Sequence, residues 1–164
     1  MTPKKRVLSV PAFGAWFRVL YCEPLQISQI SIETMNITSL KIIPYERRYK
    51  RDLLRLTQSE DRLHVHLDWN SVEEWVNDPD MPIYLAWQDR RLVGAIGAAP
   101  ALDNTTWMRL IAFSRDADID LTLAALWDVL KLDLRRINVN QVAILLLWPW
   151  TKAHIEQLGF SYCV

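Results

Sequence analysis

The sequence predicts one mixed α/β domain, a central sheet flanked by about four helices. From residue 40 onward, short β-type runs alternate with stretches of helical periodicity. Residues 118–136 carry apolar side chains at spacings of three and four, which predicts a long helix with one buried face. Residues 142–147 are uninterruptedly apolar, as expected of a strand buried on both faces. Together these patterns favour a sheet covered by helices.

Length and composition allow a single core and exclude several function classes. The chain has 164 residues, of which 51% are hydrophobic. Nineteen Lys and Arg balance nineteen Asp and Glu, so no global positive field attracts nucleic acid or an anionic membrane. Only Cys22 and Cys163 are present, which excludes a disulfide scaffold and a four-cysteine zinc site. We therefore expect a cytoplasmic protein.

Residues 1–34 differ from the rest and are predicted to be an N-terminal appendage to a domain spanning residues 35–164. Basic residues 4–6 precede an apolar stretch that could be mistaken for an export signal. Arg18 and two prolines interrupt this stretch, which argues against both a signal and a membrane span. The segment is either an appendage or the result of an upstream start codon, and the sequence leaves both open.

The first half of the domain begins with a strand and two helices. Residues 40–45 are a short apolar run that ends near a proline, which predicts a strand at or near a sheet edge. Residues 46–56 have an apolar stripe of helical period. Ser71 and Glu74 form a capping-box pattern, which predicts the start of a short helix ending near residue 78.

The helix predicted over residues 46–56 has a strongly basic face. The charged side chains on it are Arg47, Arg48, Lys50, Arg51 and Arg55. The simplest interpretation is a solvated face, since charged helix faces are common. A site for an anion or a partner is the alternative.

A three-strand meander follows. Residues 83–88 and 92–99 flank the turn 89–91 and predict a β-hairpin. A second turn at residues 103–104 precedes another β-type run over 106–114. Three sequential antiparallel strands are therefore expected.

The second half continues with a long helix and a buried strand. Aspartates gather at the start of the helix predicted over 118–136 and arginines at its end, as the helix dipole favours. After the apolar strand 142–147, residues 150–158 read as a last helix that a glycine ends, and residues 160–164 as one more strand.

This order of elements, over about residues 38–164, resembles the GNAT acyltransferases, the superfamily of acetyl-CoA-dependent N-acetyltransferases. The resemblance rests on Ile42-Ile43-Pro44-Tyr45, on the hairpin Tyr84-Leu85-Ala86-Trp87 to Arg91-Leu92-Val93-Gly94-Ala95, and on Leu158-Gly159-Phe160. It implies a splayed mixed sheet and transfer of an acetyl group to an amine.

The resemblance also implies a place for acetyl-CoA. In the superfamily, the backbone of the fourth strand holds the pantetheine arm, and the next loop and helix N-terminus bind the pyrophosphate. The matching cofactor residues here are Leu110, Ile111, Ala112, Phe113 and Arg115. Small loop residues and a helix dipole suit this task, because backbone amides must approach the phosphates closely.

Several residues depart from the pattern of the superfamily. Leu121 and Leu123 stand at the expected glycine positions, and Asp118 stands near the expected Arg or Gln. Acidic side chains there oppose a pyrophosphate, although they can instead cap the helix. Ile155 stands where a tyrosine commonly reprotonates the departing thiolate, and the neighbouring His154 need not face the same cleft.

The superfamily normally adds one further strand after the Leu-Gly-Phe strand, and this sequence stops at Val164. Three alternatives follow: a truncated chain, a strand from the segment before Met35, or a strand from a second copy. An open sheet edge would favour a homodimer.

Candidate catalytic bases lie between the first two helices, which by resemblance border the acceptor pocket. Glu60, His64 and His66 are the main candidates, with Asp68 beside them. His64, His66 and Asp68 alternate, so an extended backbone places them on one face. A metal site is a weaker interpretation, because no Cys or His pair elsewhere completes the ligands.

Two functions from different classes follow from these residues. The first is an acyl-CoA-dependent N-acetyltransferase acting on a small-molecule or peptide amine, with acetyl-CoA as co-substrate. The second is a catalytically silent GNAT-fold binding or protein-interaction module that no longer uses acetyl-CoA. The acidic helix start, the missing glycines and Ile155 favour the second.

Overall fold

The computed structural model describes residues 20–24, 40–59, 62–66, 71–146 and 148–163. The elements in chain order are β1 (Leu20–Pro24), β2 (Lys41–Pro44), the 3-10 helix η1 (Arg47–Tyr49), α1 (Lys50–Ser59), β3 (Arg62–Val65), α2 (Val72–Trp75), β4 (Ile83–Gln88), β5 (Arg91–Ala98), β6 (Thr105–Phe113), α3 (Ile119–Arg136), β7 (Gln141–Leu145), α4 (Pro149–Gln157) and β8 (Ser161–Cys163). The predicted mixed α/β class, with a central sheet and four α-helices, is confirmed.

The strands form one mixed sheet in the order β2-β4-β5-β6-β7-β1-β8, with β3 also paired to β6. The predicted meander is present, because β4, β5 and β6 pair antiparallel with their neighbours. Strands β6 and β7 run parallel, and they pair over only three residues, Thr105–Trp107 with Gln141–Ala143. Beyond that short stretch the pairing between these two strands ends.

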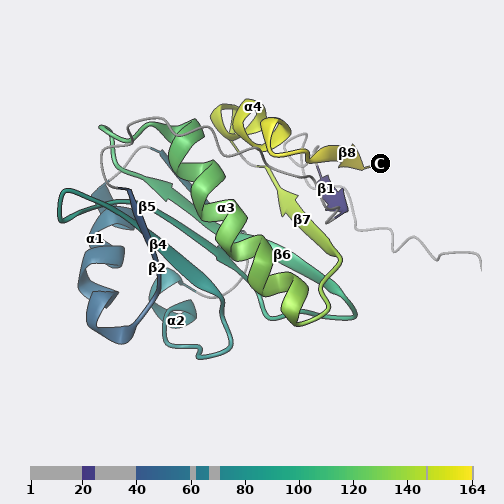
Figure 1. The fold of residues 1–164 in the computed structure, drawn as a ribbon, viewed down its shortest axis with the longest axis horizontal. Coiled ribbons are helices and arrows are strands. Elements are labelled where there is room, and N and C mark those ends of the chain that lie inside the picture. Colours follow the sequence, from purple (N-terminus) through teal and green to yellow (C-terminus); the bar gives the residue numbers. More distant parts are fainter. Residues whose placement is uncertain (1–19, 25–39, 60–61, 67–70, 147, 164) are drawn as a thin grey trace, which may run out of the picture.

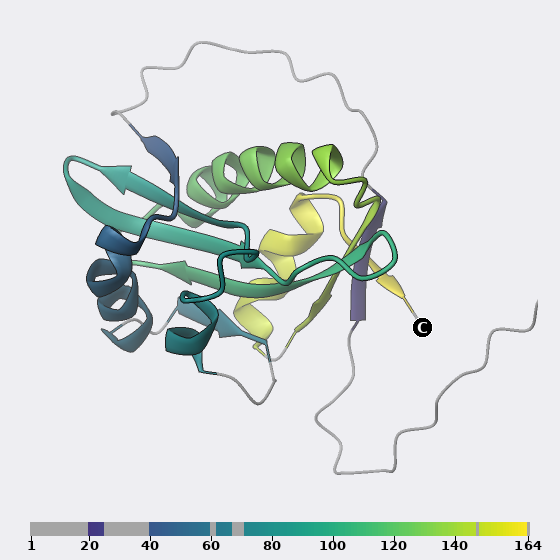
Figure 2. The same ribbon diagram turned by 90° about the horizontal axis from the view of Figure 1, so that it is seen from below.

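Helices cover the two faces of the sheet (Figures 1 and 2). Helices α3 and α4 pack on one face, where Leu126, Trp127 and Ile155 belong to the larger core cluster. Helices α1 and α2 pack on the other face, where Leu53 and Trp75 belong to the second cluster. Alternating side chains of the sheet divide between these two clusters, as the pleat of a strand requires.

The helices α2 and α3 begin at capping residues that the sequence indicated. Ser71 and Glu74 form the predicted capping box at α2, in which each residue's side chain bonds the other's backbone amide. Asp118 is the N-cap of α3, and its side chain accepts a hydrogen bond from the Leu121 amide at 3.1 Å. The predicted apolar stripe of α3 is buried: Leu123, Leu126, Trp127, Leu130 and Leu134.

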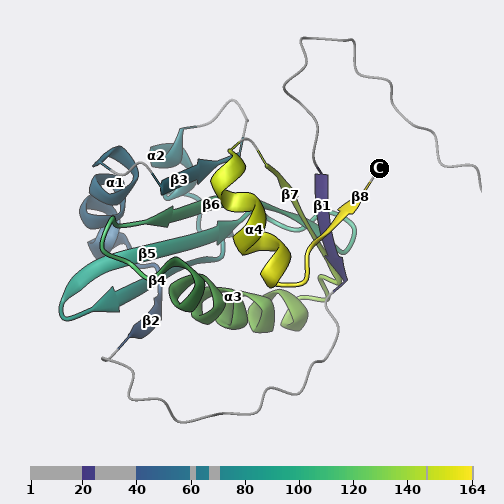
Figure 3. The ribbon, with the colours of Figure 1, turned by 90° about the horizontal axis from the view of Figure 1, so that it is seen from above.

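Part of the predicted appendage belongs to the sheet. Strand β1 lies between β7 and β8 and pairs antiparallel with both, so Leu20 is opposite Leu145 on one side and Cys163 on the other (Figure 3). Among the three alternatives for the missing strand, the structure thus shows a strand from the segment before Met35. The domain boundary near residue 35 stays a prediction.

None of the described helices combines the length and the apolar character that crossing a bilayer requires.

Gly94 on β5 brings the sheet close to α3. A Cβ at this position would lie 2.8 Å from Thr122 Cγ2 and 3.0 Å from Phe113 Cδ1. Because Thr122 is β-branched on a helix, its methyl group cannot turn away cheaply. We expect Gly94→Ala to lower the free energy of unfolding by about 1–3 kcal/mol, measured by urea denaturation.

Thr122→Ser supplies the control for this prediction, since it removes the methyl group that the new Cβ would meet. In the Thr122→Ser background, Gly94→Ala should cost measurably less. An equal cost in both backgrounds would show that the contact with Thr122 is not the cause.

Candidate functional site

The second half of β6 is enclosed by strands on both edges. Strand β5 pairs with one edge. On the other edge, where β7 no longer pairs, β3 takes its place (Figure 3). The pairs between β3 and β6 are Arg62 with Phe113, Leu63 with Ala112, His64 with Ile111, and Val65 with Leu110. The His66 amide extends this ladder by donating to the Arg109 carbonyl at 2.8 Å.

This enclosed segment contains the predicted cofactor residues. Leu110, Ile111, Ala112 and Phe113 lie together, and each is at most 1% exposed. Their backbone pairs with β5 and β3 simultaneously. Arg115 lies beyond the strand, in the turn before α3, and is exposed. The edge of β6 predicted to hold a pantetheine arm is therefore occupied by the chain's own strand.

The turn and helix start that follow β6 are dominated by acids, each with a partner. Asp116 pairs with Arg91 at 3.2 Å. Asp118 caps the Leu121 amide, as described above. Asp120 Oδ1 lies 2.5 Å from His154 Nδ1 on α4. Asp118 is therefore a helix cap, as the sequence allowed, whereas Asp116 and Asp120 pair with side chains instead.

Helix α4 has no proton-donating side chain at the position where the superfamily commonly has a tyrosine. Ile155 there is fully buried and has no proton to donate. The neighbouring His154 is joined to α3 by its contact with Asp120, a pairing that sequence analysis did not predict. Trp150 packs its ring against Phe113 of β6, with 6.5 Å between ring centroids.

The two candidate histidines lie on β3 and just after it. His64 is fully buried, and within the described residues neither ring nitrogen makes a hydrogen bond of acceptable geometry. The pKa of His64 is lowered to about 4, mainly because the ring is buried; the charge of His66 contributes to the lowering, and the nearby Met108 backbone offsets a part of it. The His66 ring packs edge-on against Trp107, with centroids 5.2 Å apart.

Glu60 and Asp68 lie outside the described residues. The structure therefore places His64 on β3 and His66 directly after it, and says nothing of the other two candidates. In the described ranges, no three His, Cys, Asp or Glu side chains gather in a way that could hold a metal ion.

Acetyl-CoA is the co-substrate that the GNAT resemblance implies, and the described residues do not fit it. The β6 edge is paired with β3, the α3 amide of Leu121 is capped by Asp118, and residues 115–121 include no glycine. A pyrophosphate would have to displace an acid from the helix end it needs. The prediction that residues 110–113 and Arg115 bind acetyl-CoA stays a prediction.

Solved structures share this fold at low sequence identity. The ribosomal-protein-S18-alanine N-acetyltransferase of Escherichia coli is 16% identical with a TM-score of 0.60, over 77% of this chain and 80% of that one. A GNAT-family acetyltransferase of Staphylococcus aureus Mu50 is 15% identical with a TM-score of 0.61, over 75% and 85%. A functionally unknown conserved protein of Staphylococcus epidermidis is 12% identical with a TM-score of 0.59; it matches 88% of this chain, which spans 57% of that protein.

No family model and no curated protein matches this sequence. The relationship is carried by the arrangement of strands and helices, since the identities are too low to transfer an activity. This chain has the fold of the GNAT acetyltransferases.

Proposed function

We propose that this chain is a GNAT-fold binding module that does not use acetyl-CoA. The observation that carries the proposal is the pairing of β3 with residues 110–113 of β6. An extended ligand arm needs an unpaired backbone edge to bind by strand-like hydrogen bonds. Here that edge is already bonded within the chain.

Packing around β3 supports a permanent place for this strand. Leu63 and Val65 pack against the core cluster beneath α1 and α2. On the opposite face His64 is fully buried, and Arg62 Nη1 donates to the Ala117 carbonyl at 3.3 Å. Removing β3 would therefore expose apolar surface on one face and break a contact to the turn before α3 on the other.

The second candidate function is an N-acetyltransferase that transfers an acetyl group from acetyl-CoA to a small-molecule or peptide amine. The shared fold of the GNAT acetyltransferases favours it. It requires β3 to leave β6, and it would leave His64 and His66 as the candidate bases. Pairing with a second copy and a cytoplasmic location likewise stay predictions.

The two functions differ in what acetyl-CoA does at β6. We expect the backbone amide resonances of Leu110, Ile111, Ala112 and Phe113 to stay unmoved when millimolar acetyl-CoA is added to the ¹⁵N-labelled protein. This readout is local, so binding elsewhere on the molecule does not affect it. Saturable shifts of these four amides would contradict the proposal and favour the acetyltransferase.

His64→Pro sharpens the comparison, because proline removes a backbone donor from β3 and weakens its pairing with β6. Ile42→Pro is a matched control, since it places a proline in the four-residue edge strand β2 instead. A binding module should gain no acetyl-CoA binding at β6 in either variant. If only the His64→Pro variant gained acetyl-CoA binding at β6, β3 would be shown to cover a competent cofactor site.

A further inference from the structure

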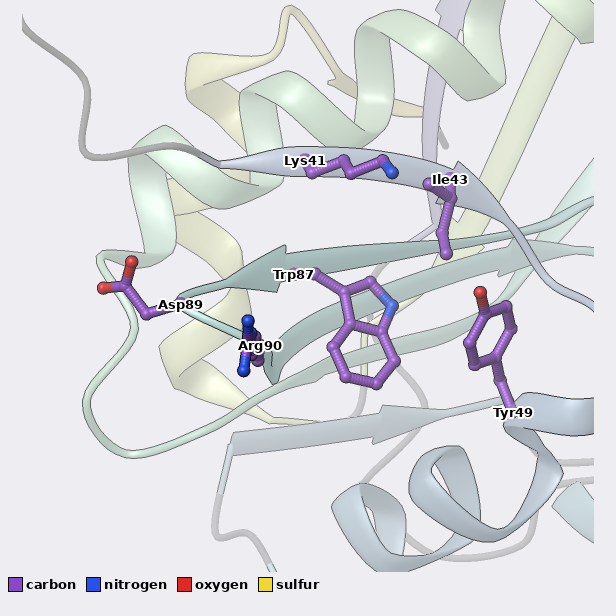
Figure 4. A pocket seen from close by; sticks show the side chains of 6 residues that line it. All are labelled: Lys41, Ile43, Tyr49, Trp87, Asp89 and Arg90. Atoms are coloured by element: carbon purple, nitrogen blue, oxygen red, sulfur yellow. The ribbon is translucent and has the colours of Figure 1, made fainter.

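Two adjoining hollows lie on the face of the sheet that α1 covers, between α1, the edge strand β2 and the tip of the β4–β5 hairpin. The first has a volume of about 530 Å³ and is lined by Lys41, Ile43, Tyr49, Trp87, Asp89 and Arg90 (Figure 4). The second has a volume of about 280 Å³, and its lining includes Arg55, Arg91 and Ser114. Trp87 and Arg90 line both, so the two hollows adjoin each other.

The first hollow presents an aromatic wall. Figure 4 shows the Trp87 indole in the middle of the lining side chains, with Tyr49 on one side and Arg90 on the other. The two rings are 5.5 Å apart and tilted by 54°. The exposed face of such a wall suits a planar ring, which would stack on it.

The second hollow presents positive charge and an unused hydroxyl group. Arg55, Arg90 and Arg91 line it together with the carboxylate of Asp52. Arg91 also pairs with Asp116, an exposed contact in which both side chains are more than two-thirds accessible. The Ser114 side chain is 6% exposed, and its hydroxyl oxygen has no partner among the described residues. Several guanidinium groups around a buried hydroxyl are suited to a phosphate.

Arg90 stands at a position that costs backbone energy. Asp89 and Arg90 form the two-residue turn of the β4–β5 hairpin with φ of 48° and 66°. Glycine is favoured at the second position of such a turn, and arginine is strained there. Arg90 and Lys41 also form no ion pair within the described residues, which leaves both cations available to an anion.

We propose that these adjoining hollows bind a nucleoside monophosphate, with the base against Trp87 and the phosphate among Arg55, Arg90 and Arg91. The strained arginine at the turn is then retained for the ligand rather than for the fold. This site does not depend on the proposed absence of acetyl-CoA binding, because it uses the α1 side of the sheet and no backbone edge of β6.

The test is an NMR titration of the indole N–H resonances of the eight tryptophans, in which Trp87→Phe identifies the Trp87 signal. AMP should shift that signal saturably. Adenosine, which lacks the phosphate, and inorganic phosphate, which lacks the ring, should each bind at least about tenfold more weakly. S-acetylpantetheine, which lacks a nucleotide, should leave the Trp87 signal unmoved, and AMP should leave the amides of residues 110–113 unmoved.

Arg90→Gly separates binding from stability. It should weaken AMP binding at least about tenfold while the melting temperature stays equal or rises, because the turn strain is relieved. Asn104→Gly is the matched control, since Asp103 and Asn104 form a turn with φ of 49° and 67° in the next hairpin. It should leave AMP binding unchanged. Three outcomes would each overturn the proposal. The Trp87 signal stays unmoved at about 10 mM AMP, inorganic phosphate binds as tightly as AMP, or the Arg90→Gly variant binds AMP as tightly as the wild type.

Discussion

Trp127→Ala is expected to lower the free energy of unfolding by about 3–5 kcal/mol. Trp127 is 1% exposed and lies in the larger core cluster, with its ring 5.2 Å from that of Phe160. Removing the indole leaves a large cavity between α3 and the sheet. For a chain of this length, the loss corresponds to a fall in melting temperature of roughly 6–20 °C.

Two variants make this measurement specific. Leu132→Ala lies on the same helix at a side chain that is 53% exposed, so it should change stability by no more than about 0.5 kcal/mol. Trp127→Phe retains an aromatic ring and removes an indole nitrogen that has no described partner, so it should cost much less than alanine. A small loss for Trp127→Ala would mean that this core is not as closely packed as described.

Acidification is expected to destabilise the protein through His64. The folded-state pKa of about 4 lies below the ordinary value of 6.5 because the ring is buried. Above pH 6.5 the ring is neutral in both states, and the stability is complete. As the pH falls from 6.5 through 4, the unfolded chain binds the proton first, so the free energy of unfolding drops by about 3 kcal/mol.

His64→Leu should abolish this part of the pH dependence. Leucine also removes two buried nitrogens that lack partners, so the variant should be at least as stable as the wild type near pH 7. Urea denaturation at several pH values between 4 and 7 measures the difference between the two proteins. Parallel pH profiles for wild type and His64→Leu would contradict the neutral, buried state of this ring.

Elements with strong local patterns were predictable from the sequence. The apolar stripe of α3, the capping box at α2 and the hairpin of β4 and β5 depend on neighbouring residues, and all three are present. A sheet strand from the segment that contains β1 was only one of three alternatives, and β3 was not placed in the sheet. Their short patterns allow an extended backbone, but pairing with β7 or β6 depends on residues distant in the sequence.

In the candidate site, too, local features were predictable from the sequence and long-range contacts were not. Residues 110–113 were correctly grouped on one strand, because they are contiguous in the sequence. That β3 pairs with them could not be predicted, because this edge of β6 is open to β3 only where β7 stops pairing with it. The pairing of Asp120 with His154 depends on how α3 and α4 meet in the folded chain. The smaller hollow beside Trp87 likewise joins residues from α1, the hairpin tip and the end of β6.

The position of β1 has a consequence for biosynthesis. Both partners of this strand are made long after it, since Leu20 lies opposite Leu145 and Cys163. In a nascent chain, the residues of β1 therefore have no strand to pair with until β7 and β8 have emerged from the ribosome. Pairing strands that are far apart in the sequence is slow, because closing the long intervening loop costs conformational entropy. At this side of the molecule, the first described strand to be translated is among the last to be incorporated into the native sheet.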